Sequence, residues 1–305
     1  KGLRILQKYL ADSLTKLIHG GKELENALNA SKILFGKSSE DDLKSIDPET
    51  IIETVEVVKE VEVTVTETVT VEVDPFADST LEGVLTSDKT LSSDKIWLIK
   101  GRVVVGDGAT LTIPAGTVIK AEPGSGADAS TLIIARGGKI DAKGTASKPI
   151  IMTAKADNIQ ADGTYPATGA SLTVNSRGLW GGLLVLGKAP SSFKGDVSEL
   201  QIEGIPVSDT NGLYGGSVSD DNSGTMQYIS IRHGGAEIGE GNEINGLTLG
   251  GVGSGTVIDH IEVIANVDDG IEFFGGTVNA SYLLVWGQGD DALDIDQAYS
   301  GTIDD

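Results

Sequence analysis

The sequence contains no cysteine, which excludes both a disulfide framework and a thiolate metal site. Aromatic residues make up only 5 % of its 305 residues, so most of the rings are expected in the core or at its edges. No uninterrupted apolar run approaches the length that spans a bilayer, and the N-terminus has no signal-peptide apolar region. The length suits one long domain or two ordinary ones.

Basic residues are scarce outside the first fifty positions. Residues 1–50 hold 8 Lys and Arg and 8 Asp and Glu, whereas the remainder holds 15 basic and 37 acidic residues and so carries the whole net charge of -22. The electric field of this negative charge repels phosphate backbones and attracts multivalent cations. We therefore expect residues 51–305 to bind no nucleic acid.

Residues 1–50 are expected to form a separate helical segment. Gly20 and Gly21 end a first helix, whose apolar residues recur at spacings of three and four: Leu3, Leu6, Leu10, Leu14 and Leu17. The stretch "LADSLTKLIHG…ELENALNASKILFGKSSEDDLKSI" resembles the helical segment that follows the catalytic domain of bacterial tyrosyl-tRNA synthetases. The catalytic signatures of that family do not occur here, so the resemblance does not imply aminoacylation. It implies a fusion segment or a gene-level chimera, either native or engineered.

Residues 51–80 are expected to be an extended linker between two bodies. In residues 51–75 valine alternates with glutamate and threonine, which is the period of an extended chain, and Pro75 ends the pattern. Repulsion between its negatively charged glutamate side chains would keep such a segment extended as a stalk. The alternative is an edge strand that pairs with a neighbouring chain, which would be a route to self-association.

From residue 81 onward, short apolar strands alternate with Gly, Asn and Asp turns, without helical periodicity. Three segments align at offsets of 32 and 22: "MQYISIRHG" (226–234), "IDHIEVIAN" (258–266) and "ASYLLVWGQ" (280–288). The alignment predicts an interior column of Ile229, Ile261 and Leu283, and the longer first interval predicts that "GEGNE" leaves the coil as a loop. These repeats predict an all-β fold for residues 81–305, a right-handed parallel β-helix or solenoid.

Several further segments continue the same repeats: "LTIPAGTVIKA", "LIIARGGKIDAKGT", "RGLWGGLLVLGKAP", "IEGIP" and "GVGSGTVIDHIEVIANVDDGIEFFGGTVN". Together, residues 80–305 resemble a family of bacterial cell-surface β-helix proteins, commonly outer-membrane lipoproteins or secretion-system cargo. The resemblance implies a cell-surface or extracellular location but no settled activity. The family's lipoprotein cysteine is missing, so membrane attachment is expected only through an absent N-terminal anchor. Members of the family continue past "GTIDD", so we expect a last coil that is truncated here.

Two acidic stretches repeat at an offset of 22: "NVDDGIEFFG" (266–275) and "QGDDALDIDQ" (288–297). The repeat predicts three stacked pairs: Asp268 with Asp290, Asp269 with Asp291, and Glu272 with Asp294. Successive coils lie about 4.8 Å apart, so these like charges require solvent, a raised pKa or a bound cation. Hard oxygen ligands favour Ca²⁺ over zinc or iron. Three interpretations stay open: a solvated turn, a Ca²⁺ site built from these six carboxylates, and catalysis.

The catalytic interpretation depends on a resemblance of the same motifs to polygalacturonase-type glycoside hydrolases, which are also β-helices. The resemblance implies that Asp268, and Asp290 with Asp291, protonate the leaving oxygen and activate a water. The His-Gly and Arg-x-Lys motifs that follow the acidic motifs in that family do not occur after Asp291 in this sequence. Hydrolysis would therefore lack the half of the site that holds the substrate.

We expect a non-catalytic cell-surface β-helix protein with a binding, adhesion or structural role. It would bind a polysaccharide or another surface partner and be stabilised by Ca²⁺; the alternative is a polysaccharide-degrading hydrolase of the polygalacturonase type. Residues that could stack on sugars are Trp97, Trp180, Trp286, Tyr228 and Tyr282. The polar segment 157–178 is too long for a tight turn and is expected to be a protruding recognition loop. His233 and His260 are expected to be structural, with His260 in one column between Tyr228 and Tyr282.

Overall fold

The computed structural model describes residues 75–304 except Asp196, Glu240 and Gly241, together with scattered residues between 11 and 28. The chain divides into two compact units, Lys1–Glu72 and Val73–Asp305. In the first unit the described residues are helical except Gly20, which has φ +93° and thus the left-handed conformation expected after a helix end. The predicted linker 51–75 lies outside the described residues except for Pro75, so the predicted domain boundaries stay predictions.

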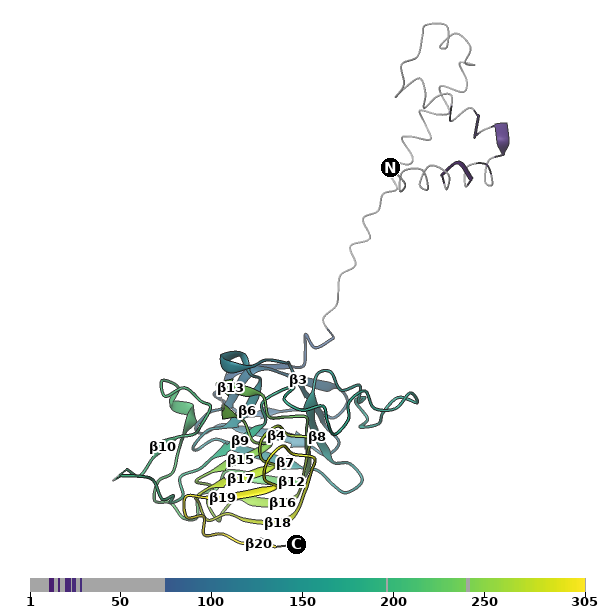
Figure 1. Ribbon diagram of the computed structural model, residues 1–305. Helices are drawn as coiled ribbons and strands as arrows, with labels where there is room; N and C mark the ends of the chain where they lie inside the picture. Colours follow the sequence, from purple (N-terminus) through teal and green to yellow (C-terminus); the bar gives the residue numbers. More distant parts are fainter. Residues whose placement is uncertain are drawn as a thin grey trace. The chain divides into compact units, whose positions relative to one another are not determined.

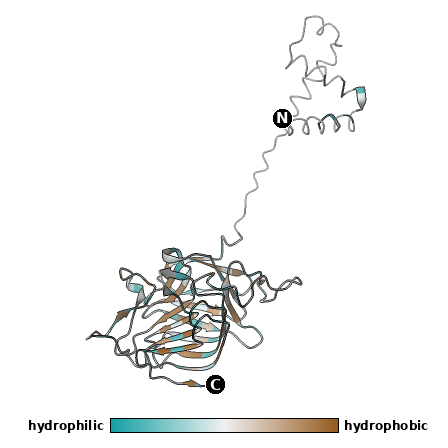
Figure 2. Ribbon diagram, in the orientation of Figure 1, coloured by the Kyte–Doolittle hydropathy of each residue, from teal (hydrophilic) through white to brown (hydrophobic). Residues whose placement is uncertain are grey.

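The second unit is an all-β parallel β-helix, as predicted. The chain passes repeatedly through three strand positions, here called faces A, C and B in chain order, and equivalent strands of successive coils pair in parallel. Figure 1 shows the coils stacked from β3 to β20, and Figure 2 shows that their strands carry much of the apolar sequence.

Some strands turn a corner and so belong to two faces. Face A comprises the second halves of β1 (Thr80–Leu85) and β3 (Ile96–Val105), then β6 (Thr131–Ile134), β9 (Leu183–Leu186), β15 (Leu247–Gly250), β17 (Ile271–Phe274) and β19 (Leu293–Asp296). Face B comprises the first halves of β1 and β3, then β5 (Val118–Ala121), β8 (Ile150–Ala154) and the second halves of β12 (Gly224–Arg232), β16 (Val257–Ile264) and β18 (Asn279–Trp286). Face C comprises β2 (Lys89–Thr90), β4 (Thr110–Pro114), β7 (Lys139–Lys143), the first halves of β12, β16 and β18, and β20 (Ile303–Asp304).

Short elements outside the coils are few in the described residues. Two antiparallel pairs and two 3₁₀ helices occur: β10 (Leu200–Gln201) with β11 (Leu213–Tyr214), β13 (Glu237–Gly239) with β14 (Asn242–Glu243), η1 (Gly126–Asp128) and η2 (Thr210–Gly212). The β13–β14 pair falls where the sequence predicted that "GEGNE" leaves the coil. Within the described residues, no helix is long and apolar enough to cross a membrane.

The core is the inside of the coils, where every second side chain of a strand points. Ile229 pairs with Ile261 and Ile261 pairs with Leu283, which confirms the predicted column. On face A the inward column ends at Leu293, which is 36 % exposed, whereas its neighbour Ile271 is fully buried. The last coil is therefore only half covered, because no described strand pairs with its other side.

The corner between faces C and B is built from residues with left-handed backbone. Tyr228, His260 and Tyr282 have φ of +50°, +54° and +54°, and they occupy the same place in three successive coils. This conformation costs about 1 kcal/mol or more for each non-glycine residue. Their rings compensate by stacking, with centroids 4.1 Å and 4.4 Å apart. The predicted column is thus confirmed, and His260 serves as its middle layer.

Two long excursions cover the outer sides of the coils. Residues 155–182 contain no helix or strand, as predicted for 157–178, and bury Ile159 against Val118 and Ile151 on face B. Residues 187–223 cover face A and bury Ile202, Ile205 and Tyr214 in a second apolar cluster. The outer side of face A is therefore partly enclosed, and this enclosure shapes the site described next.

Candidate functional site

The predicted acid pairs lie on the outer side of face A, in its last two strands. Parallel pairing of β17 with β19 puts Glu272 opposite Asp294, at the offset of 22 that the sequence predicted. Asp268 and Asp269 lie in the turn before β17, and Asp290 and Asp291 lie in the turn before β19. The two acidic stretches are therefore stacked one coil apart.

Backbone hydrogen bonds join the two turns. The Gly270 N–H donates to the carbonyl of Asp291 (2.9 Å), and the Ile271 N–H donates to that of Ala292 (3.1 Å). A Cβ at Gly270 would come within 2.3 Å of Val285 Cγ1 and 2.8 Å of the Ala292 carbonyl oxygen. Glycine is thus required here because the two coils approach closely, and this approach brings the acids together.

The carboxylates form two groups of three. One oxygen each from Asp268, Asp269 and Asp290 lie within 4.8 Å of one another, and the same holds for Asp269, Glu272 and Asp294. Asp269 belongs to both groups, so five carboxylates, here called the acid cluster, are continuous. The sixth candidate, Asp291, is exposed and contributes its backbone N–H, which donates to Asp269 Oδ1 (2.8 Å).

Two further residues reach the acid cluster from elsewhere in the chain. Glu203 comes from the excursion that covers face A, and Asn245 precedes β15. The Asn245 amide donates to Glu272 Oε2 and to Glu203 Oε1, the latter at 3.5 Å. Glu203 lies in "IEGIP" and Asn245 lies in "NEING", two stretches in the part of the sequence that resembles the cell-surface family. No periodicity in the sequence pairs them with the acids.

Burial and mutual repulsion raise the pKa values of these acids. Burial, followed by the charges of Glu203 and Asp294, raises the pKa of Glu272 to about 9. Burial also raises the pKa of Asp269 to about 6, with Asp268 acting in the same direction. The pKa of Glu203 rises to about 6 from partial burial of its carboxyl group and from the Asp268 charge, although the residue as a whole is exposed. At neutral pH and without a cation, Glu272 therefore holds a proton.

The remaining candidates have structural roles or separate positions. His233 is buried, and its Nδ1 lies 2.7 Å from the carbonyl oxygen of Ser176, which anchors the excursion over face B. Trp97 and Trp180 are buried, and the face of Tyr228 is covered by His260. Of the five aromatic residues named from the sequence, Trp286 (64 % exposed) and Tyr282 (53 % exposed) present most of their surface to solvent.

The three faces of parallel strands define a parallel β-helix domain, and its last two strands on face A carry the outward acid cluster. The family described as "Pectate-lyase like beta helix domain" matches residues 83–305, and the chain belongs to this family. No solved structure matches the chain.

Short stretches of the chain are similar to tyrosine–tRNA ligases, as the sequence predicted. The chain is 49 % identical over 61 residues to the ligase of Flavobacterium johnsoniae, which is 20 % of this chain and 14 % of that relative. It is 31 % identical over 112 residues to the ligase of Bacteroides fragilis strain YCH46, which is 36 % of this chain and 23 % of the relative. The chain thus spans less than a quarter of these relatives' length, and their activity is not transferred to it.

Proposed function

We propose that the β-helix is a non-catalytic cell-surface binding domain whose acid cluster binds Ca²⁺. The proposal rests on one observation: Asp269 belongs to both groups of three carboxylates. Carboxylate oxygens at this density are the ligands that Ca²⁺ takes, and the chain offers no thiolate that would favour a softer metal. Asn245, whose amide nitrogen donates to Glu272 and Glu203, also has a buried amide oxygen without a hydrogen-bond partner.

Electrostatics favour cation binding over the alternative of a solvated turn. Asp269 and Glu272 are each only 7 % exposed, so water does not screen them as it screens an ordinary turn. The chain's net charge of -22 deepens the negative potential around the cluster. A divalent ion would neutralise repulsion that otherwise requires protons on Glu272 and its neighbours.

A polysaccharide or another surface partner is the ligand class that the family favours. At the corner before face B and along its outer side, β18 carries Tyr282, Leu284 and Trp286, all more than half exposed. Aromatic rings of this kind stack on the apolar faces of sugar rings. The same proposal includes a surface location and attachment to a membrane through an anchor. Self-association through residues 51–75 stays a prediction, because only Pro75 of that segment lies within the described residues.

The test is thermal unfolding of the full chain in Ca²⁺ and in chelator at matched ionic strength. Ca²⁺ binding to the folded state raises the melting temperature, and the rise should be lost in Asp269→Asn and reduced in Asp268→Asn/Asp290→Asn. Asp220→Asn, which removes an exposed acid outside the cluster, is the matched control and should behave as the parent. Equal rises in parent and Asp269→Asn would mean that the ion binds elsewhere.

Hydrolysis is the second candidate, and the raised pKa of Glu272 is the observation in its favour, since a general acid must be protonated at neutral pH. The spacing argues against the inverting mechanism. One oxygen each of Asp268 and Asp290 lie within 4.8 Å, whereas an inverting pair is about 6.5–9.5 Å apart to admit a water. Release of reducing ends from acidic polysaccharides by the parent, lost in Asp290→Asn, would replace the binding function with hydrolysis.

A further inference from the structure

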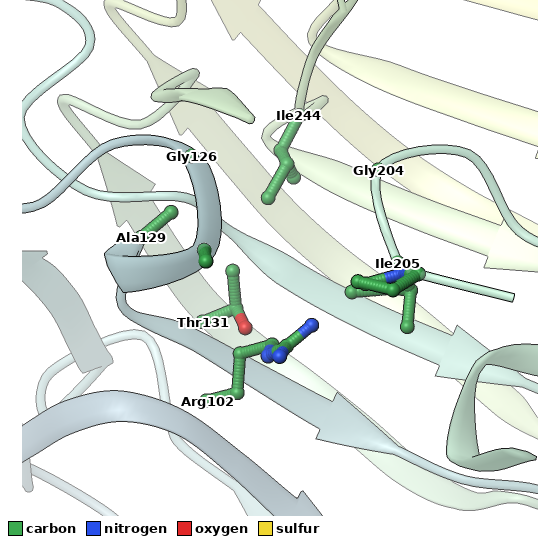
Figure 3. Close-up of a pocket in the computed structure, with 9 residues that line it drawn as sticks. Arg102, Gly126, Ala129, Thr131, Gly204, Ile205 and Ile244 are labelled. Carbon is green, nitrogen blue, oxygen red and sulfur yellow. The ribbon is translucent and has the colours of Figure 1, made fainter. Parts of the chain in front are cut away.

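A cavity of about 140 Å³ opens on the outer side of face A in the first coils, and none of the five carboxylates of the acid cluster lines it. Its floor is formed by Arg102 on β3 and Thr131 on β6, which are opposite each other in the parallel pairing. Its walls are largely apolar and come from three other segments: Ile205 with Pro206, Ile244, and the loop that carries Ala127 and Ala129. Figure 3 shows Arg102 and Thr131 beside each other, with Ile205 and Ile244 on the surrounding segments.

The hydroxyl at the floor of this cavity is unsatisfied. Thr131 is 1 % exposed, and its Oγ1 has no hydrogen-bond partner. Buried polar atoms are almost always paired, because an unpaired one loses its bonds to water without replacement. An unpaired hydroxyl lining a cavity is therefore a group that a ligand would satisfy.

The arginine at the floor is also unusual within this acidic chain. Among the arginines of the described residues, Arg136 pairs with Glu199, Arg232 pairs with Glu262, and Arg177 donates to a backbone carbonyl. Arg102 has neither an ion pair nor a hydrogen bond within the described part of the chain, although it is half-buried. Asp128, the nearest acid along the lining loop, is exposed and does not pair with it.

We propose that this cavity binds a short aliphatic carboxylate. The guanidinium of Arg102 pairs with the carboxylate, which arginine recognises through two parallel N–H donors, and the Thr131 hydroxyl donates a third bond. The apolar stem packs against Ile205 and Ile244. An apolar cavity of roughly 150 Å³ holds a benzene-sized molecule, so an acid of three or four carbons fits and a sugar acid does not.

The test uses the full chain with ¹³C-labelled isoleucine methyl groups, titrated with sodium propionate while sodium chloride holds the ionic strength constant. Saturable shifts are expected for the methyls of Ile205 and Ile244, and none for Ile119 in the interior of face B. Propionamide, which has the same shape without the charge, should produce no saturable shift, and glucuronate should bind at least tenfold more weakly than propionate.

Two variants assign the binding to the named groups. Arg102→Gln should weaken propionate at least tenfold, and Thr131→Val, which keeps the side-chain shape, should weaken it by about three- to tenfold. Arg177→Gln changes the net charge equally from another loop and should bind as the parent does. Thr131→Val should melt no lower than the parent, since it removes an unpaired hydroxyl.

Four outcomes would overturn the proposal. They are shifts that grow linearly without saturation, equal binding of propionamide, parent-like affinity in Arg102→Gln, and tighter binding of glucuronate than of propionate. Because no carboxylate of the acid cluster lines the cavity, the titration should give the same affinity in chelator. Loss of the Ca²⁺ response in the parent would therefore leave this result standing, and the reverse also holds.

Discussion

One outward column of face A changes its chemistry halfway along the stack. After the exposed Val84, its next residues are apolar and are buried under the excursion that covers the sheet: Val104, Ile133 and Leu184. The parallel pairing continues the same column through Thr248 and then to Glu272 and Asp294. The strands pair in parallel without a register shift in both halves, so the change lies in the side chains.

The comparison separates what stabilises the fold from what serves the site. The apolar half gains free energy when the excursion covers it, because apolar surface leaves water. The acidic half loses free energy under the same cover, because carboxylates are desolvated beside like charges. The stability of the acidic half therefore depends on protons or on a bound cation, whereas that of the apolar half does not.

The largest effect is expected from the apolar half. Leu184→Ala removes a side chain that is 1 % exposed and should lower the free energy of unfolding by about 2–5 kcal/mol. Urea denaturation measures the loss. The rise in melting temperature with Ca²⁺ should match that of the parent, and a vanished rise would show that the two halves are not independent.

A smaller loss is expected at the turn that joins the coils. Gly270→Ala forces a Cβ against Val285 and the Ala292 carbonyl, which should cost about 1–3 kcal/mol in the free energy of unfolding. Because the turn carries Asp269, the Ca²⁺ response should fall as well. Thermal unfolding with and without Ca²⁺ measures both effects, and parent-like values for both would refute the role given to this close approach.

The acidic half should make the stability of the folded state depend on pH. In chelator, Glu272 has a pKa of about 9 in the folded state and about 4.5 when unfolded, so the folded state holds a proton that the unfolded state releases. Stability should therefore fall as pH rises between these two values. Each unit by which the pKa stays raised after solvent screening corresponds to about 1.4 kcal/mol.

The variant Glu272→Gln tests this sign, since it cannot ionise. Melting temperatures across that pH range in chelator should decline less steeply than those of the parent, and should exceed them at the alkaline end. Asp220→Asn is again the control. A parent-like slope in Glu272→Gln would mean that the proton is not held by this residue.

The smallest effect is expected at the exposed end of the aromatic column. Tyr282→Ala removes the ring stacked on His260 and should lower the free energy of unfolding by about 0.5–1.5 kcal/mol. Tyr282→Gly loses the same ring but relieves the left-handed backbone at φ +54°, so it should be the more stable of the two by about 1 kcal/mol. The reverse order, measured by urea denaturation, would contradict the strain argument.

The sequence predicted the coils because strand repeats leave a periodic signal. Ile229, Ile261 and Leu283 recur at fixed offsets, and the stacking of Glu272 on Asp294 follows from the same register. Each coil repeats the environment of the previous one, so equivalent positions select similar residues. The same logic predicted the column of Tyr228, His260 and Tyr282.

The sequence could not predict what the excursions place against the coils. Glu203 reaches the acid cluster only because Ile202 and Ile205 on either side of it pack onto face A, and no repeat records that packing. The cavity beside Arg102 depends on the same segment. At Asp291 the repeat alone was misleading. Asp291 repeats Asp269 in sequence, but it is exposed because no described strand covers that side of the last coil.

The most direct test of the account is the number of protons released when Ca²⁺ binds. Calorimetric titrations at neutral pH in two buffers of different ionisation enthalpy measure that number. Net proton release is expected from the parent, because Glu272 must lose its proton to become a ligand, and Glu272→Gln should release fewer protons. Binding of Ca²⁺ without proton release, or with equal release in both proteins, would contradict the claim that the cation and the protons exchange at this cluster.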